Sequence, residues 1–159
     1  MNRIFALLLG IFAYCSAHAQ VEVVSLAKLE AVLSSSTDTV HVINFWATWC
    51  KPCIEELPYF EEAHSFYASS NVRILLVSLD MSSELERTLL PFIKKKKLQS
   101  EIVLLNEPDP NAWIDKIEPS WTGSLPATII FNGTSKKRLF FERQITKEEL
   151  FSTIQQMKE

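Results

Sequence analysis

VHVINFWATWCKPC, at residues 40–53, joins an apolar run to two cysteines that are two residues apart. Val40 to Trp46 is rich in β-branched and aromatic residues, which is typical of a buried strand. The residues after Cys53 mix apolar and acidic side chains in the pattern of an amphipathic helix. The stretch therefore predicts a strand, a turn and a helix, with both cysteines at the turn.

The turn places Cys50 at or near the N-terminus of the predicted helix. Unpaired backbone N–H groups and the positive end of the helix dipole favour a thiolate there. Such surroundings lower a thiol pKa from about 8.5 into a range of about 3.5–7.5. Two thiols in this position indicate thiol–disulfide exchange.

Two other uses of the cysteine pair stay open. A zinc site usually needs four ligands, but the only other cysteine is Cys15 and no histidine has ligand-like spacing to the pair. A purely structural disulfide would close a loop too short to constrain the unfolded chain strongly. Exchange chemistry is favoured over both, and no metal site is predicted.

Residues 1–19 have the pattern of a secretory signal peptide. Arg3 gives a positive start, Ile4 to Tyr14 form an apolar core, and Ala17-His18-Ala19 matches the cleavage pattern. The apolar core is shorter than the roughly 20 residues of a membrane span. We expect cleavage before Gln20 and a periplasmic or other extracytoplasmic location, with an uncleaved anchor as the alternative.

Cys15 makes lipid attachment a further alternative, although the bulky Tyr14 stands where lipoprotein signals carry a small residue. If Cys15 leaves with the signal peptide, Cys50 and Cys53 are the only thiols of the mature chain. One close pair provides no disulfide framework in an oxidising compartment. The pair is therefore predicted to react rather than to cross-link the fold.

Residues 20–159 have the length of one domain. The whole chain is 47% hydrophobic, which is ample for a core, and its formal net charge is −3. A mildly acidic, evenly charged surface argues against nucleic acid as a partner. The run Lys94 to Lys97 is expected to end a helix, where cations suit the dipole.

Helical and strand patterns alternate along this domain. The predicted helices are 25–33, 51–68, 82–97 and 146–158, with a helical turn at 113–117, and the predicted strands are 40–46, 72–79, 102–105, 127–131 and 137–142. Strands separated by helices predict a parallel core, and a final hairpin turning at Asn132-Gly133 adds antiparallel strands. The fold class is α/β, with a mixed central sheet and helices on both faces.

Two motifs carry a family resemblance. NFWATWCKPC at residues 44–53, followed by Glu56-Leu57-Pro58, resembles the thioredoxin superfamily, and within it the secreted TlpA/ResA-like thiol-disulfide oxidoreductases. Gly123-Ser124-Leu125-Pro126-Ala127-Thr128 resembles the cis-proline loop of that superfamily. The resemblance covers nearly all of residues 20–159. It implies the thioredoxin fold and a redox-active Cys50–Cys53 disulfide with no other cofactor.

The resemblance also implies roles for the residues around the pair. Cys50 is expected to be the attacking nucleophile, and Cys53 to resolve the mixed disulfide. Pro52 stiffens the turn, and Lys51 adds a cation beside the thiolate. Trp49 is expected to form an apolar rim that receives the partner.

The proline loop supplies the other half of the expected substrate site. By resemblance, the bond before Pro126 is cis, which costs only about 0.5–1 kcal/mol for an X–Pro bond. The loop would pack near the cysteines and leave the backbone of Leu125 free to pair with an extended substrate. The alternative is an ordinary trans proline before a strand.

Two positions concern proton transfer. Asn44 stands where thioredoxins typically have a buried aspartate that assists the resolving cysteine, and an amide cannot transfer that proton. Glu56 is the substitute, because it lies one helical turn after Cys53 and matches a glutamate of ResA-like proteins. A partly buried glutamate would have a raised pKa and could move protons; the alternative is a surface glutamate beside Glu55.

The remaining tryptophans divide between core and surface roles. Trp46 is expected in the core. Trp113 and Trp121 lie in segment 107–124, which is longer than a simple thioredoxin needs and either shapes substrate choice or covers the core.

The resemblance implies a reductase of disulfides in exported client proteins, such as apocytochromes c, that is recharged by a membrane thiol-transfer donor. A disulfide-introducing oxidase is the first alternative. A thiol peroxidase is a second, although the sequence context of a peroxide site is absent ahead of the turn. A non-enzymatic Cu(I) metallochaperone is the third, because two thiolates can hold Cu(I).

Overall fold

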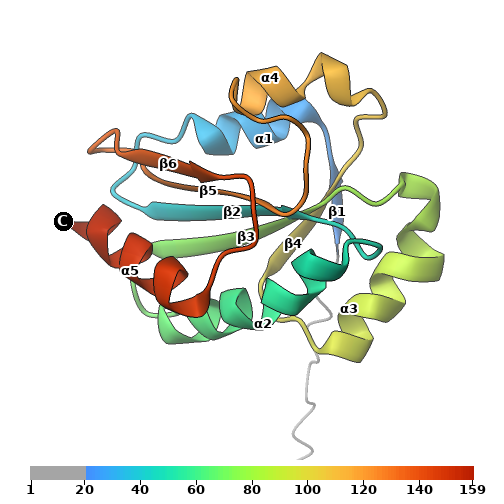
Figure 1. Cartoon of the computed structure of the whole chain (residues 1–159), viewed down its shortest axis with the longest axis horizontal. Coiled ribbons are helices and arrows are strands. Elements are labelled where there is room, and N and C mark those ends of the chain that lie inside the picture. Colours follow the sequence, from blue (N-terminus) through green and yellow to red (C-terminus); the bar gives the residue numbers. More distant parts are fainter. Residues whose placement is uncertain (1–20) are drawn as a thin grey trace, which may run out of the picture.

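The computed structural model describes residues 21–159 (Figure 1). The predicted signal peptide, its cleavage site and Cys15 lie outside these residues. Within the described range, no helix has both the length and the apolar character that crossing a membrane requires.

A mixed sheet forms the centre of the domain, as predicted, and it has six strands. Its strands are β1 (Glu22–Val24), β2 (Val40–Trp46), β3 (Val72–Ser78), β4 (Glu101–Leu105), β5 (Ala127–Asn132) and β6 (Arg138–Phe141). The order across the sheet is β1-β4-β3-β2-β5-β6. The first four strands in that order are parallel, and β5 runs antiparallel to both β2 and β6.

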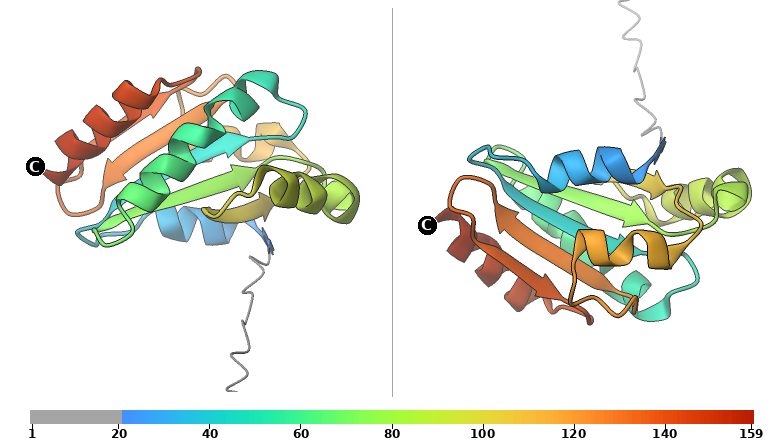
Figure 2. Two further views of the ribbon diagram at one scale, coloured as in Figure 1. Left: turned by 90° about the horizontal axis from the view of Figure 1, so that it is seen from below. Right: turned by 90° about the horizontal axis from the view of Figure 1, so that it is seen from above.

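Helices cover both faces of this sheet, which confirms the predicted fold class. They are α1 (Leu26–Leu33), α2 (Lys51–Phe66), α3 (Leu90–Lys96), α4 (Ile114–Ile117) and α5 (Lys147–Lys158). Figure 2 shows α2, α3 and α5 on one face and α1 with α4 on the other. The core is accordingly split into two apolar clusters, one on each side of the sheet.

Strand β2 lies between β3 and β5, and all seven of its residues are buried. Val42 and Trp46 belong to the cluster under α2 and α5, whereas Ile43 and Phe45 belong to the cluster under α1 and α4. Successive strand residues point to opposite faces, so a strand covered on both faces must be apolar nearly throughout. This burial explains the apolar run that the sequence shows, and it confirms Trp46 as a core residue.

Two parts of the fold differ from the sequence expectation. Strand β1 was not predicted, because three residues carry too little pattern to be recognised, and it pairs with β4 about 80 positions later. The predicted helix 82–97 begins with a 3-10 turn (Ser82–Glu84) and a π turn (Leu85–Leu89) before α3. Pro91 has no N–H to donate to the carbonyl of residue 87, so the α-helical hydrogen-bond pattern is interrupted ahead of α3.

The predicted hairpin between β5 and β6 is present, but its turn extends beyond Asn132-Gly133. The N–H of Asn132 donates to the carbonyl of Lys137 at 3.0 Å, which closes a longer loop between β5 and β6. A Cβ atom at Gly133 would lie 2.1 Å from the carbonyl oxygen of Ser35. Gly133 is thus required by the close approach of this loop to the segment after α1.

Replacing Gly133 with alanine should destabilise the domain, because the added methyl group overlaps backbone atoms that cannot move independently. We expect the free energy of unfolding in urea to fall by about 1–3 kcal/mol, the usual range for overpacking. Thr134→Ala, in the same loop and exposed, is the control and should change that free energy by less than about 0.5 kcal/mol. Equal stability of the two variants would contradict this account.

Candidate active site at the start of helix α2

Cys50 and Cys53 are joined by a disulfide at the start of α2, with an S–S distance of 1.97 Å. Cys50 is the N-cap residue of the helix, and its Sγ accepts a hydrogen bond from the N–H of Cys53 at 3.3 Å. Cys50 is 6% exposed and Cys53 is fully buried. The predicted position of Cys50 at the helix N-terminus is confirmed, and it is the more accessible sulfur of the two.

Three neighbours of the pair lie on the surface. Trp49 is 69% exposed, and Lys51 and Pro52 are also exposed. The Nζ of Lys51 lies 3.9 Å from Oε1 of Glu55, and both side chains face solvent. A solvated pair of this kind contributes little energy, so Lys51 offers a positive charge at the surface of the site rather than a fixed contact.

The proline loop lies at the same end of the sheet. The Leu125–Pro126 peptide bond is cis, as the resemblance implied. Ala127 is paired with Phe45, so the loop reaches the end of β2 at which the cysteine turn begins. Pro126 is buried and Leu125 is half-buried.

A buried polar cluster lies beneath the disulfide and centres on Glu56, which is fully buried one turn after Cys53. The Nδ2 of Asn44 donates to Oε1 of Glu56 at 2.8 Å and to Oγ1 of Thr128 at 3.0 Å. The N–H of Ile145 donates to Oε2 of Glu56 at 2.8 Å. The surface alternative for Glu56 is therefore wrong, and its carboxyl joins α2 to β2 and to the segment before α5.

Burial raises the pKa of Glu56 to about 7, against the opposing effect of the hydrogen bonds from Ile145 and Asn44. Removal from water disfavours the charged carboxylate more than those two donors stabilise it. A carboxyl group with this pKa exchanges its proton near neutral pH, as a proton carrier must.

Asp80 is a site residue that the sequence analysis missed. It is buried (4% exposed) and accepts hydrogen bonds from the N–H of Thr48 at 3.1 Å, from its hydroxyl at 2.6 Å, and from the hydroxyl of Ser78 at 2.7 Å. The N–H of Cys50 donates to the carbonyl of Ala47 at 3.1 Å. Asp80 thus holds the turn on which Cys50 sits.

The sequence contains a signal that could have identified this contact. Asp80 and Thr48 each follow the end of a strand by two residues, and those strands, β3 and β2, are parallel neighbours. The carboxyl ends of parallel neighbours meet at one edge of the sheet, where α/β folds place their sites.

Segment 107–124 covers the core on the other face. Trp113 and Trp121 are buried, their ring centroids lie 5.5 Å apart, and Trp121 also contacts Phe45 at 4.7 Å. The indole N–H groups donate to backbone carbonyls of Glu107 and Ser124. The segment could either shape substrate choice or cover the core, and these contacts show that it covers the core.

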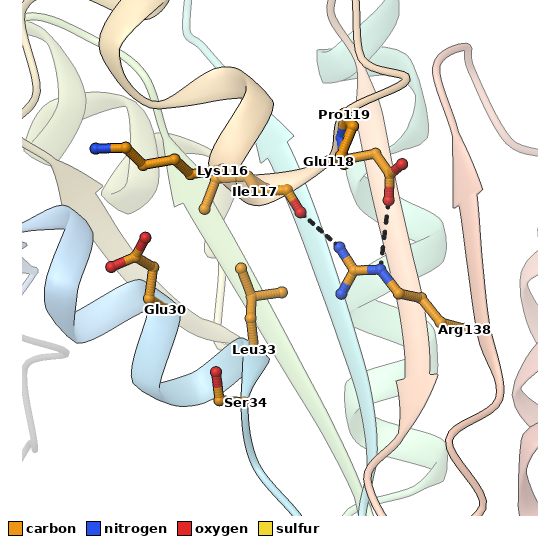
Figure 3. A pocket seen from close by; sticks show the side chains of 8 residues that line it. All are labelled: Glu30, Leu33, Ser34, Lys116, Ile117, Glu118, Pro119 and Arg138. Carbon is orange, nitrogen blue, oxygen red and sulfur yellow. Dashed lines mark hydrogen bonds and ion pairs between the residues drawn. The ribbon is translucent and has the colours of Figure 1, made fainter.

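A separate open hollow of about 520 Å³ lies between α1 and α4 (Figure 3). Arg138 borders it and is already engaged, donating to the carbonyl of Ile117 at 2.7 Å and facing Glu118 at 3.4 Å. None of the predicted site residues lines this hollow. In the part of the chain that the structure describes, no three His, Cys, Asp or Glu side chains are grouped to hold a metal ion.

Comparisons with known proteins agree with this geometry. The model of the AhpC/TSA family matches residues 17–136. The sporulation thiol-disulfide oxidoreductase A of Bacillus subtilis is 32% identical over 111 residues, which are 64% of this chain and 67% of that protein. The thiol-disulfide oxidoreductase ResA of Geobacillus thermodenitrificans is 28% identical over 117 residues, 73% of this chain and 62% of that protein.

The fold is shared with solved structures as well. A secreted thiol-disulfide isomerase from Corynebacterium glutamicum superposes with a TM-score of 0.63 at 18% identity, covering 79% of this chain and 74% of that one. The chain spans about two thirds of the length of the curated relatives named above. Since the family model covers most of the sequence, the chain belongs to the AhpC/TSA family, and its curated relatives there are thiol-disulfide oxidoreductases.

Proposed function

We propose that this chain reduces disulfides of exported client proteins by thiol–disulfide exchange at Cys50 and Cys53. The observation that carries the proposal is the position of the pair: one sulfur at the helix N-terminus, accepting a backbone N–H, and the other buried one turn before Glu56. The arrangement provides an attacking sulfur, a protected resolving sulfur and a proton carrier.

The reaction begins from the reduced pair. The Cys50 thiolate attacks one sulfur of the client disulfide, the client S–S bond breaks, and the released client thiolate takes up a proton. Cys53 then gives its proton to Glu56 and attacks the sulfur of Cys50, which releases the second client thiolate. Two electrons pass to the client, and the chain is left with the Cys50–Cys53 disulfide seen in the structure.

Glu56 is proposed as the base for the second step. Its pKa of about 7 leaves it partly ionised at neutral pH, so it can accept the proton of Cys53 and return it later. Asn44 cannot act as an acid or a base, but its amide holds the Glu56 carboxyl in place. In this proposal Glu56, on α2, takes the role that the buried aspartate on β2 has in thioredoxins.

Client docking is proposed at the exposed side of the same site. The backbone of Leu125, ahead of the cis peptide bond, pairs with an extended client segment, and the exposed ring of Trp49 provides apolar contact. Lys51 and Pro52 are exposed on this surface, and the buried Pro126 holds the loop that carries Leu125. The partners are disulfide-containing proteins, including apocytochromes c, and a membrane thiol-transfer protein that restores the dithiol.

Export supports this set of partners. Residues 1–19 carry the signal-peptide pattern, and the isomerase of Corynebacterium glutamicum that shares the fold is itself described as secreted. We therefore place the mature protein, residues 20–159, in the periplasm or another extracytoplasmic compartment.

Cys53→Ala should trap clients as mixed disulfides, because the intermediate on Cys50 then lacks its resolving thiol. Non-reducing gels followed by mass spectrometry of the variant expressed in an oxidising compartment measure the trapped species. Cys50→Ala is the matched control and should trap far fewer clients. Recovery of no covalent partner with Cys53→Ala would count against exchange.

The reduction potential of the pair decides the direction of electron flow. A value near −270 mV, the range of thioredoxin, is expected for the proposed reductase, whereas about −120 mV, the range of DsbA, would indicate an oxidase. Equilibration with glutathione or dithiothreitol buffers, read by thiol alkylation, measures it. A Cu(I) titration of the reduced protein should show no high-affinity site. A high-affinity site would instead favour the metallochaperone alternative.

Ionisation of Glu56 should make stability depend on pH. The folded state holds its proton up to a pKa of about 7 and the unfolded chain only to about 4.5, so between these values the folded state binds more protons and the free energy of unfolding falls as pH rises. The decrease is on the order of 3 kcal/mol. Urea unfolding of the oxidised protein from pH 4 to 8 measures it.

Glu56→Gln should remove this decrease and also the pH dependence near 7 of the rate at which Cys53 resolves the mixed disulfide. Glu55→Gln, at the exposed neighbouring position, is the control and should keep both. If the free energy of unfolding of Glu56→Gln fell with pH as steeply as that of the unsubstituted protein, another group would be responsible for the decrease.

A further inference from the structure

The segment from Glu142 to Ile145, between β6 and α5, contacts two different parts of the site. Its first residue holds the loop ahead of Pro126, and its last residue donates to the carboxyl of Glu56. We call residues 142–145 the connecting segment. Neither contact is suggested by the motifs of the sequence.

Glu142 binds the proline loop through several hydrogen bonds. The N–H of Thr122 donates to both carboxylate oxygens, at 2.9 and 3.1 Å, and the N–H of Ser124 donates to Oε1 at 2.9 Å. The hydroxyl of Thr122 donates to the same oxygen. Partial burial of Glu142 opposes its ionisation, but the donors from Thr122 and Ser124 outweigh that effect and lower its pKa, so it is ionised at neutral pH.

Besides Glu142, two contacts restrict the movement of the proline loop. Its base is anchored in the core by Trp121, whose indole N–H donates to the carbonyl of Ser124 at 2.9 Å. Gly123, at its crest, has φ +94° and lies over the Cδ1 atom of Ile114. A client that presses on Leu125 therefore displaces a short loop that is held by the Glu142 carboxylate and by the indole of Trp121.

The other end of the connecting segment is held near Glu56. Ile145 is fully buried in the cluster under α2 and α5, and its N–H lies 2.8 Å from Oε2 of Glu56. Arg143, between the two ends, forms a two-point ion pair with Glu149 of α5 at 2.8 and 2.6 Å. Only Arg143 and Gln144 thus separate Glu142, whose carboxylate holds the loop, from Ile145, whose N–H holds Glu56.

A second path from the same loop reaches the other oxygen of Glu56. Thr128, two residues after Pro126, accepts from Asn44, and Asn44 donates to Oε1 of Glu56. The two paths leave the proline loop in opposite directions along the chain and end on the two oxygens of one carboxyl group. A displacement of the loop therefore acts on the surroundings of Glu56 from both sides.

We propose that Glu142 is a positioning residue that couples the proline loop to the hydrogen bond between Ile145 and Glu56. The inference rests on the proposed function, in which a client polypeptide docks at the loop and Glu56 accepts the proton of Cys53. When a client docks, the connecting segment shifts, the Ile145 N–H turns from Oε2, and Glu56 holds a proton more tightly. A Glu56 carboxylate that is ionised at that moment is then a stronger base and takes the proton of Cys53 while the client is bound.

Other charged groups near Glu56 are already paired. Arg143 faces Glu149, and Lys147, at the start of α5, faces Glu62 of α2 at 2.6 Å. The hydrogen bonds that the Glu56 carboxyl receives within the described residues come from Asn44 and Ile145. A change in its titration therefore reports on these two donors and on its burial.

The test is the titration of Glu56 followed by carbon-13 NMR of its side-chain carboxyl in the oxidised mature protein. Glu142→Ala should raise the midpoint by about half a pH unit or more, because loss of a donor to the carboxylate disfavours ionisation. Glu148→Ala, an exposed glutamate at the start of α5, is the control and should leave the midpoint unchanged. Glu142→Gln keeps one oxygen acceptor and should give an intermediate shift.

A midpoint in Glu142→Ala equal to that of the unsubstituted protein would overturn the proposal, even if client binding weakens, because Glu142 would then only shape the loop. If Glu142→Ala does not fold, Glu142→Gln decides by the same criterion. The titration needs neither client nor electron donor. Its result is therefore independent of whether the protein proves to be a reductase.

Discussion

The burial of β2 on both faces is the constraint on which the rest of the structure depends. This strand pairs with β3 on one side and with β5 on the other, and every one of its side chains is covered. The turn that carries Cys50 follows its end, its neighbour β5 brings Pro126 to that turn, and Asn44 within the strand donates to Glu56. Because the strand is fixed in the core, it holds the cysteine turn and the base of the proline loop at the same end of the sheet.

The polar cluster inside this core opposes stability and serves chemistry. A glutamate without exposure gains two hydrogen bonds, yet burial still raises its pKa to about 7. An apolar residue on the same face of α2 would avoid the desolvation of a carboxylate. Retaining the carboxyl group is understandable if its proton is used. Asp80 has a different role from Glu56. Its carboxyl group accepts three close donors and holds the cysteine turn in place.

Most of the fold and the centre of the site follow from local sequence patterns. The strand 40–46 and the cysteine turn are predictable because apolar runs, helix starts and the cysteine spacing are local, and the resemblance supplied the cis bond before Pro126. What the sequence missed depends on tertiary contact: β1 is defined by β4, and Asp80 acts through Thr48. The turn at Asn132-Gly133 also differs from the prediction because of a tertiary contact, since Gly133 lies against Ser35 of a distant segment.

The different exposures of the adjacent residues Trp49 and Cys50 limit which disulfides can reach the reactive sulfur. Trp49 presents 69% of its surface while Cys50, the next residue, presents 6%, so the reactive cysteine is largely covered although a large exposed ring stands beside it in the chain. A disulfide buried in a folded protein, or lying flush with a rigid surface, cannot reach such a sulfur along the line of the S–S bond. A bond carried on a loose, extended chain can. Under the proposed function, a site of this shape favours client polypeptides that have not yet folded.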